Sequence, residues 1–214
     1  MKIGPVVKRD VMMASAMLEH EEKYSVILAF DVKVERDAQD MADNTGVKIF
    51  QADIIYRLFD RFTEYQEELI RKKREEFKHT AVFPCKLRVM PDSVFVKRSG
   101  LIMSGVIVEA GVVKTGTPIC VPSKDFIDVG VVTSLQSNKQ ELEMARRGEE
   151  VCVKIASVPG EAPKTFGRHF DETDFLVSKI NRASIDACKN YFRDDLQKDD
   201  WKLMIELKKT FEIM

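Results

Sequence analysis

The sequence predicts an α/β plus β fold: a partial α/β/α sandwich domain, a long connecting helix, and a small antiparallel β-barrel followed by two C-terminal helices. Three observations support this expectation. Helix-like and strand-like segments alternate up to residue 62, charged residues dominate 63–79, and short β-branched runs recur at close spacing over 80–181. Strands so short and close cannot each be followed by a crossover helix. Neighbouring strands therefore pair antiparallel, and closure into a barrel removes the exposed edges.

The first region is expected to alternate helices with strands. In order, we expect a helix, a strand, a helix, a strand and a helix over residues 11–18, 25–34, 35–44, 47–50 and 52–62. Asp10 can act as the N-cap of the first helix, and Gly46 suits the left-handed position after the second. This order implies right-handed parallel crossovers. Since two clear strands are few for an independent parallel sheet, we expect this domain to be truncated at its N-terminus.

Residues 63–79 continue as a charged helix in which acidic and basic residues balance. Glu67 with Arg71, and Glu68 with Lys72, have the i, i+4 spacing and orientation that contribute about 0.2–0.5 kcal/mol per pair on an isolated helix. Such a helix is either a rigid spacer between domains or an RNA-facing surface. Because the acids cancel the bases, we favour the spacer.

The barrel region is expected to consist of short strands separated by turns. The expected strands are 81–90, 94–96, 101–108, 119–121, 129–133, 151–155 and 175–180. The turn signals are Ala110-Gly111, Thr115-Gly116, Pro122-Ser123 and Arg147-Gly148. A loop rich in Pro and Gly, residues 157–170, precedes the last strand. Regular short strands with turn signals of this kind are typical of a small barrel.

The last region, residues 182–214, changes to helical periodicity. Ser184 can cap a helix over 185–196, and Asp199 or Asp200 can cap a second helix over 201–211. The apolar positions of the second helix are too many for one narrow stripe.

Composition excludes several classes of protein. The formal net charge is -1 over 214 residues, so any RNA contact must be a local patch. The four cysteines are far apart and form no CxxC pair, which favours buried, reduced thiols in a cytosolic protein. The sequence contains no long apolar run and no signal-peptide pattern, so we expect a cytoplasmic protein.

Catalytic motifs are missing from the sequence. Gly100 with Gly105, and Gly111 with Gly116, have the glycine spacing of a phosphate loop, but neither pair is followed by Lys and then Ser or Thr. Both pairs lie between β-runs, so we expect turns there. The histidines, at positions 20, 79 and 169, lack the spacing of metal ligands, and no nucleophile motif accompanies them. We therefore expect no catalytic residue and no metal site.

Six strings taken together resemble a single protein family. They are 31–43 (DVKVERDAQDMAD), 54–60 (IIYRLFD), 82–86 (VFPCK), 116–118 (GTP), 167–169 (GRH) and 200–209 (DWKLMIELKK). They are similar to the C-terminal region, domains III and IV, of the eukaryotic branch of the initiation factor 2 family of translational GTPases. The resemblance covers essentially the whole chain. The segment 111–116 (GVVKTG) alone resembles the second-domain barrel of several translational GTPases.

The resemblance implies three parts. Residues 1–62 correspond to an N-terminally truncated domain III, 63–79 to the long connecting helix, and 80–214 to domain IV, with its barrel over 80–181 and its helices over 182–214. The family's full-length members are ribosome-dependent GTPases that promote subunit joining, and their GTP and Mg²⁺ belong to a GTPase domain that this chain lacks. We therefore expect no enzyme and no cofactor in this chain. The long helix would transmit GTP-dependent motion, and we expect a monomer whose partners include the ribosomal subunits.

By the same resemblance, domain IV binds the acceptor end of initiator Met-tRNA. The candidate tRNA-binding residues are Gly167, Arg168, His169 and Phe170. A guanidinium can pair with phosphate and stack on a base, a glycine lets the backbone approach closely, and the two rings could stack on the terminal adenosine. The alternative is that Arg168 pairs with Asp171 or Glu172 on the protein surface.

The resemblance also implies that the C-terminal helices bind the acidic C-terminal tail of initiation factor 1A. The candidate partner-binding residues are Trp201, Lys202, Ile205, Leu207, Lys208, Lys209 and Phe211. Isoleucines of such a tail would enter an apolar groove while its carboxylates meet lysines at the rim, with Trp201 and Leu207 as anchors. The alternative is that Trp201 packs on the preceding helix and that the lysines are solvated charges.

Two other functions remain open from the sequence. The chain could be a structural lever that docks on the ribosome and has no ligand of its own. It could also be an autonomous enzyme acting on a small molecule, which the missing phosphate loop disfavours.

Overall fold

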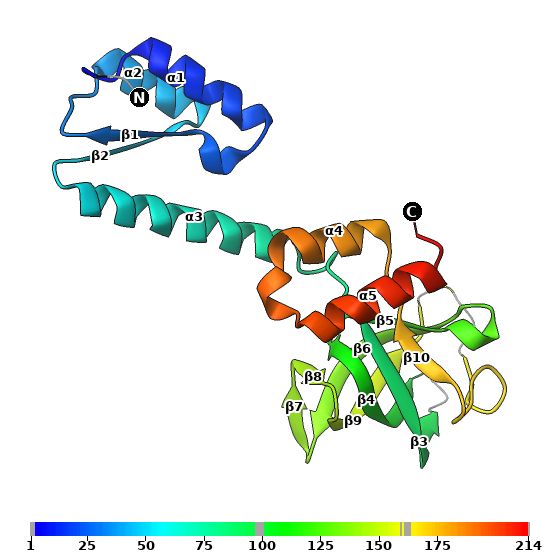
Figure 1. The fold of residues 1–214 in the computed structure, drawn as a ribbon. Helices are drawn as coiled ribbons and strands as arrows, with labels where there is room; N and C mark the ends of the chain where they lie inside the picture. The colour runs from blue at the N-terminus through cyan, green and yellow to red at the C-terminus, as the bar shows by residue number, and fades with distance from the viewer. Residues whose placement is uncertain (1–2, 97–100, 159, 161–163, 214) are drawn as a thin grey trace. The chain divides into compact units, whose positions relative to one another are not determined.

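The computed structural model describes the chain except for residues 1–2, 97–100, 159, 161–163 and 214. The chain divides into two compact units, Met1–Glu75 and Glu76–Met214. The helix α3 (Ile55–Phe77) runs across the boundary between them (Figure 1). The predicted helices over 52–62 and 63–79 are therefore one continuous helix, in which the expected pair of Glu68 and Lys72 is formed at 2.9 Å. The other expected pair on this helix is not formed.

The first unit contains a two-stranded parallel sheet and two helices on one of its faces (Figure 1). Its elements are α1 (Lys8–Ser15), the 3-10 turns η1 (Ala16–Glu19) and η2 (Glu22–Tyr24), β1 (Val26–Phe30), α2 (Arg36–Thr45) and β2 (Lys48–Ala52). Its core gathers Val6, Val11, Ala29, Ala38, Ala42 and Val47. Small residues on α2 allow that helix to lie close to the sheet, and Gly46 ends it at φ +83°, as expected from the sequence.

The other face of this sheet is only partly covered. Phe50 of β2 contacts the rings of Phe62 and Tyr65 on α3, at centroid distances of 6.4 and 5.4 Å. Leu28 and Phe30 of β1 remain about half exposed, because alternate side chains of a strand point to opposite faces. Side chains of α3 therefore bury this face of the sheet only in part.

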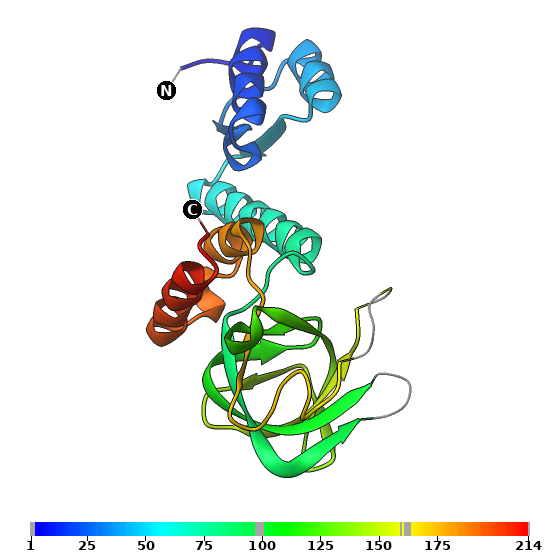
Figure 2. The ribbon, with the colours of Figure 1, turned by 90° about the vertical axis from the view of Figure 1, so that its right-hand side faces the viewer.

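The second unit is built on a closed antiparallel barrel, as the sequence predicted. Among the described residues, six strands form the ring in the order β3-β10-β5-β6-β9-β4, and β4 pairs back with β3. They are β3 (Cys85–Val96), β4 (Ile102–Lys114), β5 (Pro118–Val121), β6 (Ile127–Ser137), β9 (Glu150–Ala156) and β10 (Phe175–Ser178). The short strands β7 (Gln140–Leu142) and β8 (Met144–Arg146) pair with β6 and β4 and were not predicted. Figure 2 shows the strands surrounding the barrel interior.

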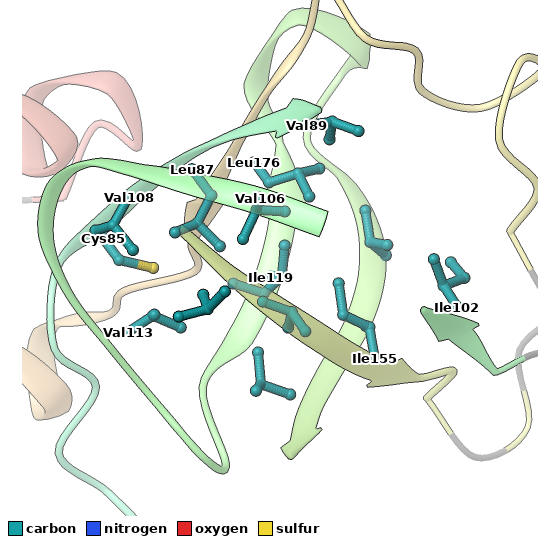
Figure 3. Packing of buried hydrophobic residues seen from close by; sticks show 14 of the residues in the cluster. Cys85, Leu87, Val89, Ile102, Val106, Val108, Val113, Ile119, Ile155 and Leu176 are labelled. Atoms are coloured by element: carbon teal, nitrogen blue, oxygen red, sulfur yellow. The ribbon is translucent and has the colours of Figure 1, made fainter. Parts of the chain in front are cut away.

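The barrel interior is filled by β-branched and leucine side chains from every strand of the ring (Figure 3). On β3, Cys85, Leu87 and Val89 alternate inward and are at most 1% exposed. Period-two alternation on closed strands thus accounts for the short hydrophobic runs in the sequence.

One predicted turn is wrong. Ala110-Gly111 lies inside β4, which continues to Lys114. Gly111 has φ +78°, and a Cβ atom there would lie 2.0 Å from the carbonyl oxygen of Pro84 and 2.8 Å from Cδ2 of Leu203. The glycine is therefore needed because strand and neighbouring backbone approach closely, and not because the chain reverses.

The C-terminal helices α4 (Arg182–Tyr191) and α5 (Lys198–Thr210) cover one side of the barrel (Figures 1 and 2). Short 3-10 turns, η3 (Pro122–Lys124) and η4 (Arg193–Asp195), lie after β5 and between the two helices. Leu203, Met204 and Leu207 of α5 pack with outward-facing barrel residues such as Val112 and Val177. A second hydrophobic core therefore joins the helices to the barrel.

Three helices begin earlier than predicted, and for the same reason. Asp10, Ser184 and Asp200, expected as N-caps, each occupy the third helical position of α1, α4 and α5. Their side chains accept the backbone N–H of the residue before each helix, at 3.0, 3.0 and 2.8 Å. This is the backward half of a capping box, so the polar residue marks the helix start but lies one turn inside it.

Candidate functional site

The predicted tRNA-binding residues lie on a compact loop between β9 and β10. The N–H of Gly167 donates to the carbonyl of Phe170 at 2.8 Å, and the N–H of His169 donates to the carbonyl of Thr165 at 3.0 Å. Gly167 has φ +83° with no atom near its missing Cβ. Glycine is thus favoured here by the left-handed backbone and not by close approach of another part of the chain.

Two aromatic rings fix the loop to the barrel. Phe166 and Phe170 meet edge to face, with centroids 5.5 Å apart and an interplanar angle of 77°. Phe170 is 1% exposed and belongs to the barrel core, against which Phe166 packs. The expectation that Phe170 contacts a ligand directly does not agree with this position, because its ring is enclosed. Its side chain instead holds the loop.

Arg168 is exposed and makes no hydrogen bond or ion pair with any residue that the structure describes. The alternative partners expected from the sequence do not pair with it. Asp171 accepts hydrogen bonds from Thr173 and lies 3.6 Å from Nζ of Lys124. The guanidinium of Arg168 is therefore available to an incoming group.

His169 is oriented by its own loop. Its Nδ1 accepts the backbone N–H of Thr165 at 2.9 Å and lies 3.0 Å from the hydroxyl of the same residue. A backbone N–H can only donate, so the proton of the neutral ring is on Nε2. The ring thus has a fixed orientation with Nε2 away from its loop partner.

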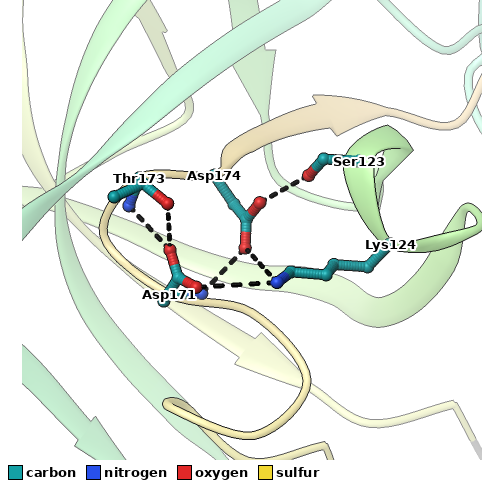
Figure 4. Close-up of polar contacts among 5 residues, drawn as sticks. All are labelled: Ser123, Lys124, Asp171, Thr173 and Asp174. Carbon is teal, nitrogen blue, oxygen red and sulfur yellow. Dashed lines mark hydrogen bonds and ion pairs between the residues drawn. The ribbon is translucent and has the colours of Figure 1, made fainter.

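A polar cluster lies at the end of this loop (Figure 4). Asp174 accepts a hydrogen bond from the hydroxyl of Ser123, and its other oxygen accepts the N–H of Asp171 at 3.0 Å. Lys124 lies 3.6 Å from Asp171 and 3.9 Å from Asp174. Hydrogen bonds from Thr173, assisted by the charge of Lys124, hold the pKa of Asp171 below its usual value. Sequence reasoning missed this cluster because its two halves are about fifty residues apart.

The predicted partner-binding residues of α5 divide between two faces. Leu207 is 3% exposed and packs in the core under the helix, so it is not accessible as an anchor. Trp201 is half-buried against the same core, whereas Ile205 is 55% exposed. Trp201 and Ile205 are four residues apart and share a helical face. Of the two predicted anchors, only Trp201 reaches the surface.

The lysines of α5 differ in their surroundings. Lys202 pairs with Asp199 at 2.7 Å within the first turns of the helix. Lys208 is half-buried and Lys209 is exposed, and neither ammonium group makes an ion pair with a residue that the structure describes. Two lysines without an ion pair to a described residue therefore lie near the C-terminal end of α5, and the exposed Lys198 is a third at its start.

Beside that end, Phe211 contacts Phe126 at a centroid distance of 5.3 Å. Phe126 is 40% exposed and has φ +55°, after Asp125 at φ +52°. With Thr210 and Glu212, the two rings line a shallow hollow of about 320 Å³. Sequence reasoning missed Phe126, because two successive left-handed residues without glycine leave no signal in the sequence.

The glycines and cysteines considered for catalysis have structural surroundings. Gly111 lies within β4 and Gly116 in the turn before β5, so neither opens a helix where a phosphate could bind. Burial raises the pKa of Cys85, Cys120 and Cys188 to about 12. Over the described part of the chain, no three His, Cys, Asp or Glu residues gather as metal ligands would. Nor does any described helix combine the length and apolar character needed to cross a bilayer.

The second unit is a closed antiparallel barrel with an exposed arginine on the loop before β10, and comparisons place the chain among translation factors. Residues 1–63 match the family model of Translation-initiation factor 2, and residues 83–177 match that of Elongation factor Tu domain 4. The first match falls within the α/β unit and the second covers the barrel. The chain belongs to the translation initiation factor 2 family, and it is similar to the C-terminal region of eukaryotic translation initiation factor 5B.

The similarity extends over nearly the whole chain. Eukaryotic translation initiation factor 5B of Homo sapiens is 61% identical over 212 residues, which are 99% of this chain and 17% of the human protein. The Saccharomyces cerevisiae factor is 41% identical over 222 aligned residues, covering 99% of this chain and 22% of its own length. The chain therefore spans about a fifth of the length of these relatives.

A solved structure shows the same architecture. The crystal structure of GDP-bound aIF5B from Aeropyrum pernix is similar with a TM-score of 0.53 and 29% sequence identity. The match covers 97% of this chain and 33% of the archaeal one.

Proposed function

We propose that the chain is the non-catalytic C-terminal part of a translation initiation GTPase that promotes joining of ribosomal subunits in the cytoplasm. Its family membership and its partial span of longer relatives support this proposal. GTP and Mg²⁺ would be held by a GTPase domain elsewhere in the full-length protein. Gly111 does not need a phosphate to explain it, because a Cβ atom there would lie 2.0 Å from the carbonyl oxygen of Pro84. We also propose that the chain is monomeric.

The barrel unit is proposed to bind the acceptor end of initiator Met-tRNA through residues 167–169. The observation that carries this proposal is the exposed Arg168, which pairs with no residue that the structure describes and lies on a loop fixed by two aromatic rings. A planar guanidinium can form two parallel hydrogen bonds with phosphate or stack on a splayed base. His169 adds a ring of fixed orientation that can donate from Nε2.

The test is binding of Met-charged initiator tRNA to the Arg168→Ala variant. Loss of one phosphate or base contact should weaken binding by about tenfold and lower the salt slope by about one. Arg193→Ala is the matched control, because Arg193 is also exposed but lies on η4 beside the helices. If both variants bind tRNA equally well, the tRNA assignment of the loop is wrong.

The outer face of α5 is proposed to bind the acidic C-terminal tail of initiation factor 1A. Trp201, Ile205 and Lys209 recur at a spacing of four residues, so apolar and basic side chains share one stripe. The hollow beside Phe126 and Phe211 lies at the C-terminal end of the same helix. Isoleucine side chains of the tail would contact the apolar residues while its carboxylates meet the lysines. Leu207 would act only indirectly, by holding the helix in place.

This proposal can be tested with the synthetic acidic peptide and amide NMR shifts. Ile205→Ala should weaken peptide binding by several-fold, since a half-exposed side chain at an interface centre contributes about 1 kcal/mol. Ile55→Ala is a matched control, because Ile55 is 52% exposed, close to the 55% of Ile205, but lies at the start of α3. Equal affinity of the two variants would contradict the assignment.

The long helix supports a second role, transmission of GTP-dependent motion. A continuous helix of 23 residues is about 35 Å long and, with balanced charges, suits a spacer. Leu69→Pro should break it at a local cost of about 3 kcal/mol and reduce subunit joining by the full-length factor. Met-tRNA binding by the barrel should persist. If Arg168→Ala leaves tRNA binding unchanged while Leu69→Pro abolishes joining, the lever without a ligand is the better description.

A further inference from the structure

The buried carboxylate of Asp174 holds the loop that carries Arg168. Asp174 is 6% exposed, and each of its oxygens has a partner. Oδ1 accepts the hydroxyl of Ser123, and Oδ2 accepts the N–H of Asp171 at 3.0 Å (Figure 4). The ammonium of Lys124 lies 3.9 Å from Oδ2. These partners compensate the free-energy cost of burying the carboxylate. Removing them would leave a buried charge unpaired, which is strongly unfavourable.

These contacts join two segments that are distant in the sequence. Ser123 and Lys124 belong to η3, the turn between β5 and β6. Asp171 and Asp174 lie between the Arg168 loop and β10, and the N–H of Asp174 also donates to the carbonyl of Asp171 at 3.2 Å. The C-terminal end of the loop is therefore attached to the opposite turn by a hydrogen-bonded carboxylate, in addition to the buried ring of Phe170.

We infer that Asp174 is a positioning residue for RNA binding: it holds the loop against η3, so that Arg168 is already oriented when the acceptor end arrives. This inference rests on the proposed tRNA-binding function of the loop. Its physical basis is pre-organisation. A loop that is ordered before binding loses less conformational freedom on association, and affinity rises accordingly. Asp174 does not touch the ligand, since its side chain is buried.

Electrostatic repulsion alone predicts the opposite effect of removing the Asp174 charge on the affinity for RNA. A carboxylate six residues from Arg168 repels the phosphates of an RNA, so removing its charge should strengthen binding. The positioning role predicts instead that removal weakens binding. The sign of the effect therefore separates the two explanations.

Glu172 provides a matched control for charge. It is exposed, lies two residues from Asp174, and makes no hydrogen bond or ion pair with the described residues. Glu172→Gln removes the same charge from the same segment but no contact. Asp174→Asn keeps the shape of the side chain but removes its attraction to Lys124. The Ser123 hydroxyl and the Asp171 N–H both donate to the carboxylate, and an amide has only one oxygen to accept from them.

The experiment titrates the 214-residue chain with Met-charged initiator tRNA at fixed salt. The variants are Asp174→Asn, Glu172→Gln, Arg168→Ala and the double variant Asp174→Asn with Arg168→Ala. Asp174→Asn should bind about fivefold more weakly, as expected for loss of about one charged hydrogen bond, while Glu172→Gln binds equally or more tightly. The double variant should bind no more weakly than Arg168→Ala alone. Hydrogen exchange of the amides of Gly167 and His169 should be faster in Asp174→Asn.

Ser123→Ala covers the case in which Asp174→Asn does not fold. It removes one hydrogen bond from Asp174 at an exposed position and should weaken binding about twofold, again only when Arg168 is present. Circular dichroism of each variant reports whether the barrel is intact.

Three results would overturn the inference. Asp174→Asn could bind as tightly as Glu172→Gln, it could weaken binding equally without Arg168, or its loop amides could exchange at the unchanged rate. If Arg168→Ala weakens binding but Asp174→Asn does not, only the positioning role fails. If Arg168→Ala itself has no effect, the tRNA-binding proposal fails and the positioning role fails with it.

Discussion

Replacement of Gly111 by alanine tests the close approach of β4 to the backbone of Pro84 and the side chain of Leu203. A Cβ atom at this position would lie 2.0 Å from the carbonyl oxygen of Pro84 and 2.8 Å from Cδ2 of Leu203. That carbonyl also accepts the N–H of Val112 at 2.9 Å, so moving it away weakens a buried hydrogen bond. The methyl group can be accommodated only if backbone moves.

The expected cost has two parts. A residue other than glycine at φ +78° costs about 1 kcal/mol or more. Overpacking against backbone adds about 1–3 kcal/mol. Together they predict about 3 kcal/mol of lost stability in the second unit, and a melting temperature lower by roughly 10 °C.

Gly116→Ala is the control for this prediction. Gly116 has φ +85°, close to that of Gly111, but no atom lies within 4 Å of its missing Cβ. It should cost only about 1 kcal/mol. Trp201 is the single tryptophan of the chain and packs against the core that contains Leu203, so its fluorescence in urea reports on this unit. Equal unfolding midpoints for the two variants would show that the close approach has no energetic consequence.

The remaining predictions concern packing, acid stability and thiol reactivity. Leu207→Ala should destabilise the second unit by about 2–4 kcal/mol in urea, whereas Ile205→Ala should change it by less than about 0.5 kcal/mol, because only the first side chain is buried. The folded-state pKa of Asp171 is lowered, so its contribution to stability is present above the unfolded pKa of about 3.9 and is lost as the pH falls through the folded value. Asp171→Asn should therefore destabilise the chain at pH 6, and this difference should shrink as the pH is lowered below about 3.9; a difference that does not depend on pH would contradict the assignment. Iodoacetamide should label the half-exposed Cys152 first in the folded chain, since the other three thiols are buried; mass spectrometry after trypsin digestion identifies the labelled site.

Local sequence patterns located most elements but misplaced several boundaries, and the errors have physical causes. Polar residues that begin helices were recognised at Asp10, Ser184 and Asp200, yet each lies at the third helical position. A polar side chain at the third helical position bonds the backbone N–H before the helix, whereas one at the N-cap bonds an N–H inside it. Both positions favour similar residue types, so the sequence does not distinguish them. Gly111 was taken for a turn because a left-handed glycine in a strand and one in a turn look alike in sequence.

The sequence grouped the candidate site residues without their orientations, which the structure shows to differ. Arg168 is exposed as expected, whereas Phe170 points into the barrel. On α5, Ile205 faces outward and Leu207 inward, although both were grouped as contacts of one partner. Phe126 and Asp174 were not found at all, since each acquires its role from a segment distant along the chain.

The sequence by itself determined the fold class, the order of most elements and the family. These follow from hydrophobic periodicity and from short strings of residues, which are properties of the linear chain. Only the tertiary structure decided which side chains face outward and which hold them in place. That division depends on what packs against each element, and in a closed barrel the packing partners of a loop, such as Ser123 and Lys124 under the Arg168 loop, come from strands and turns that meet only when the ring closes.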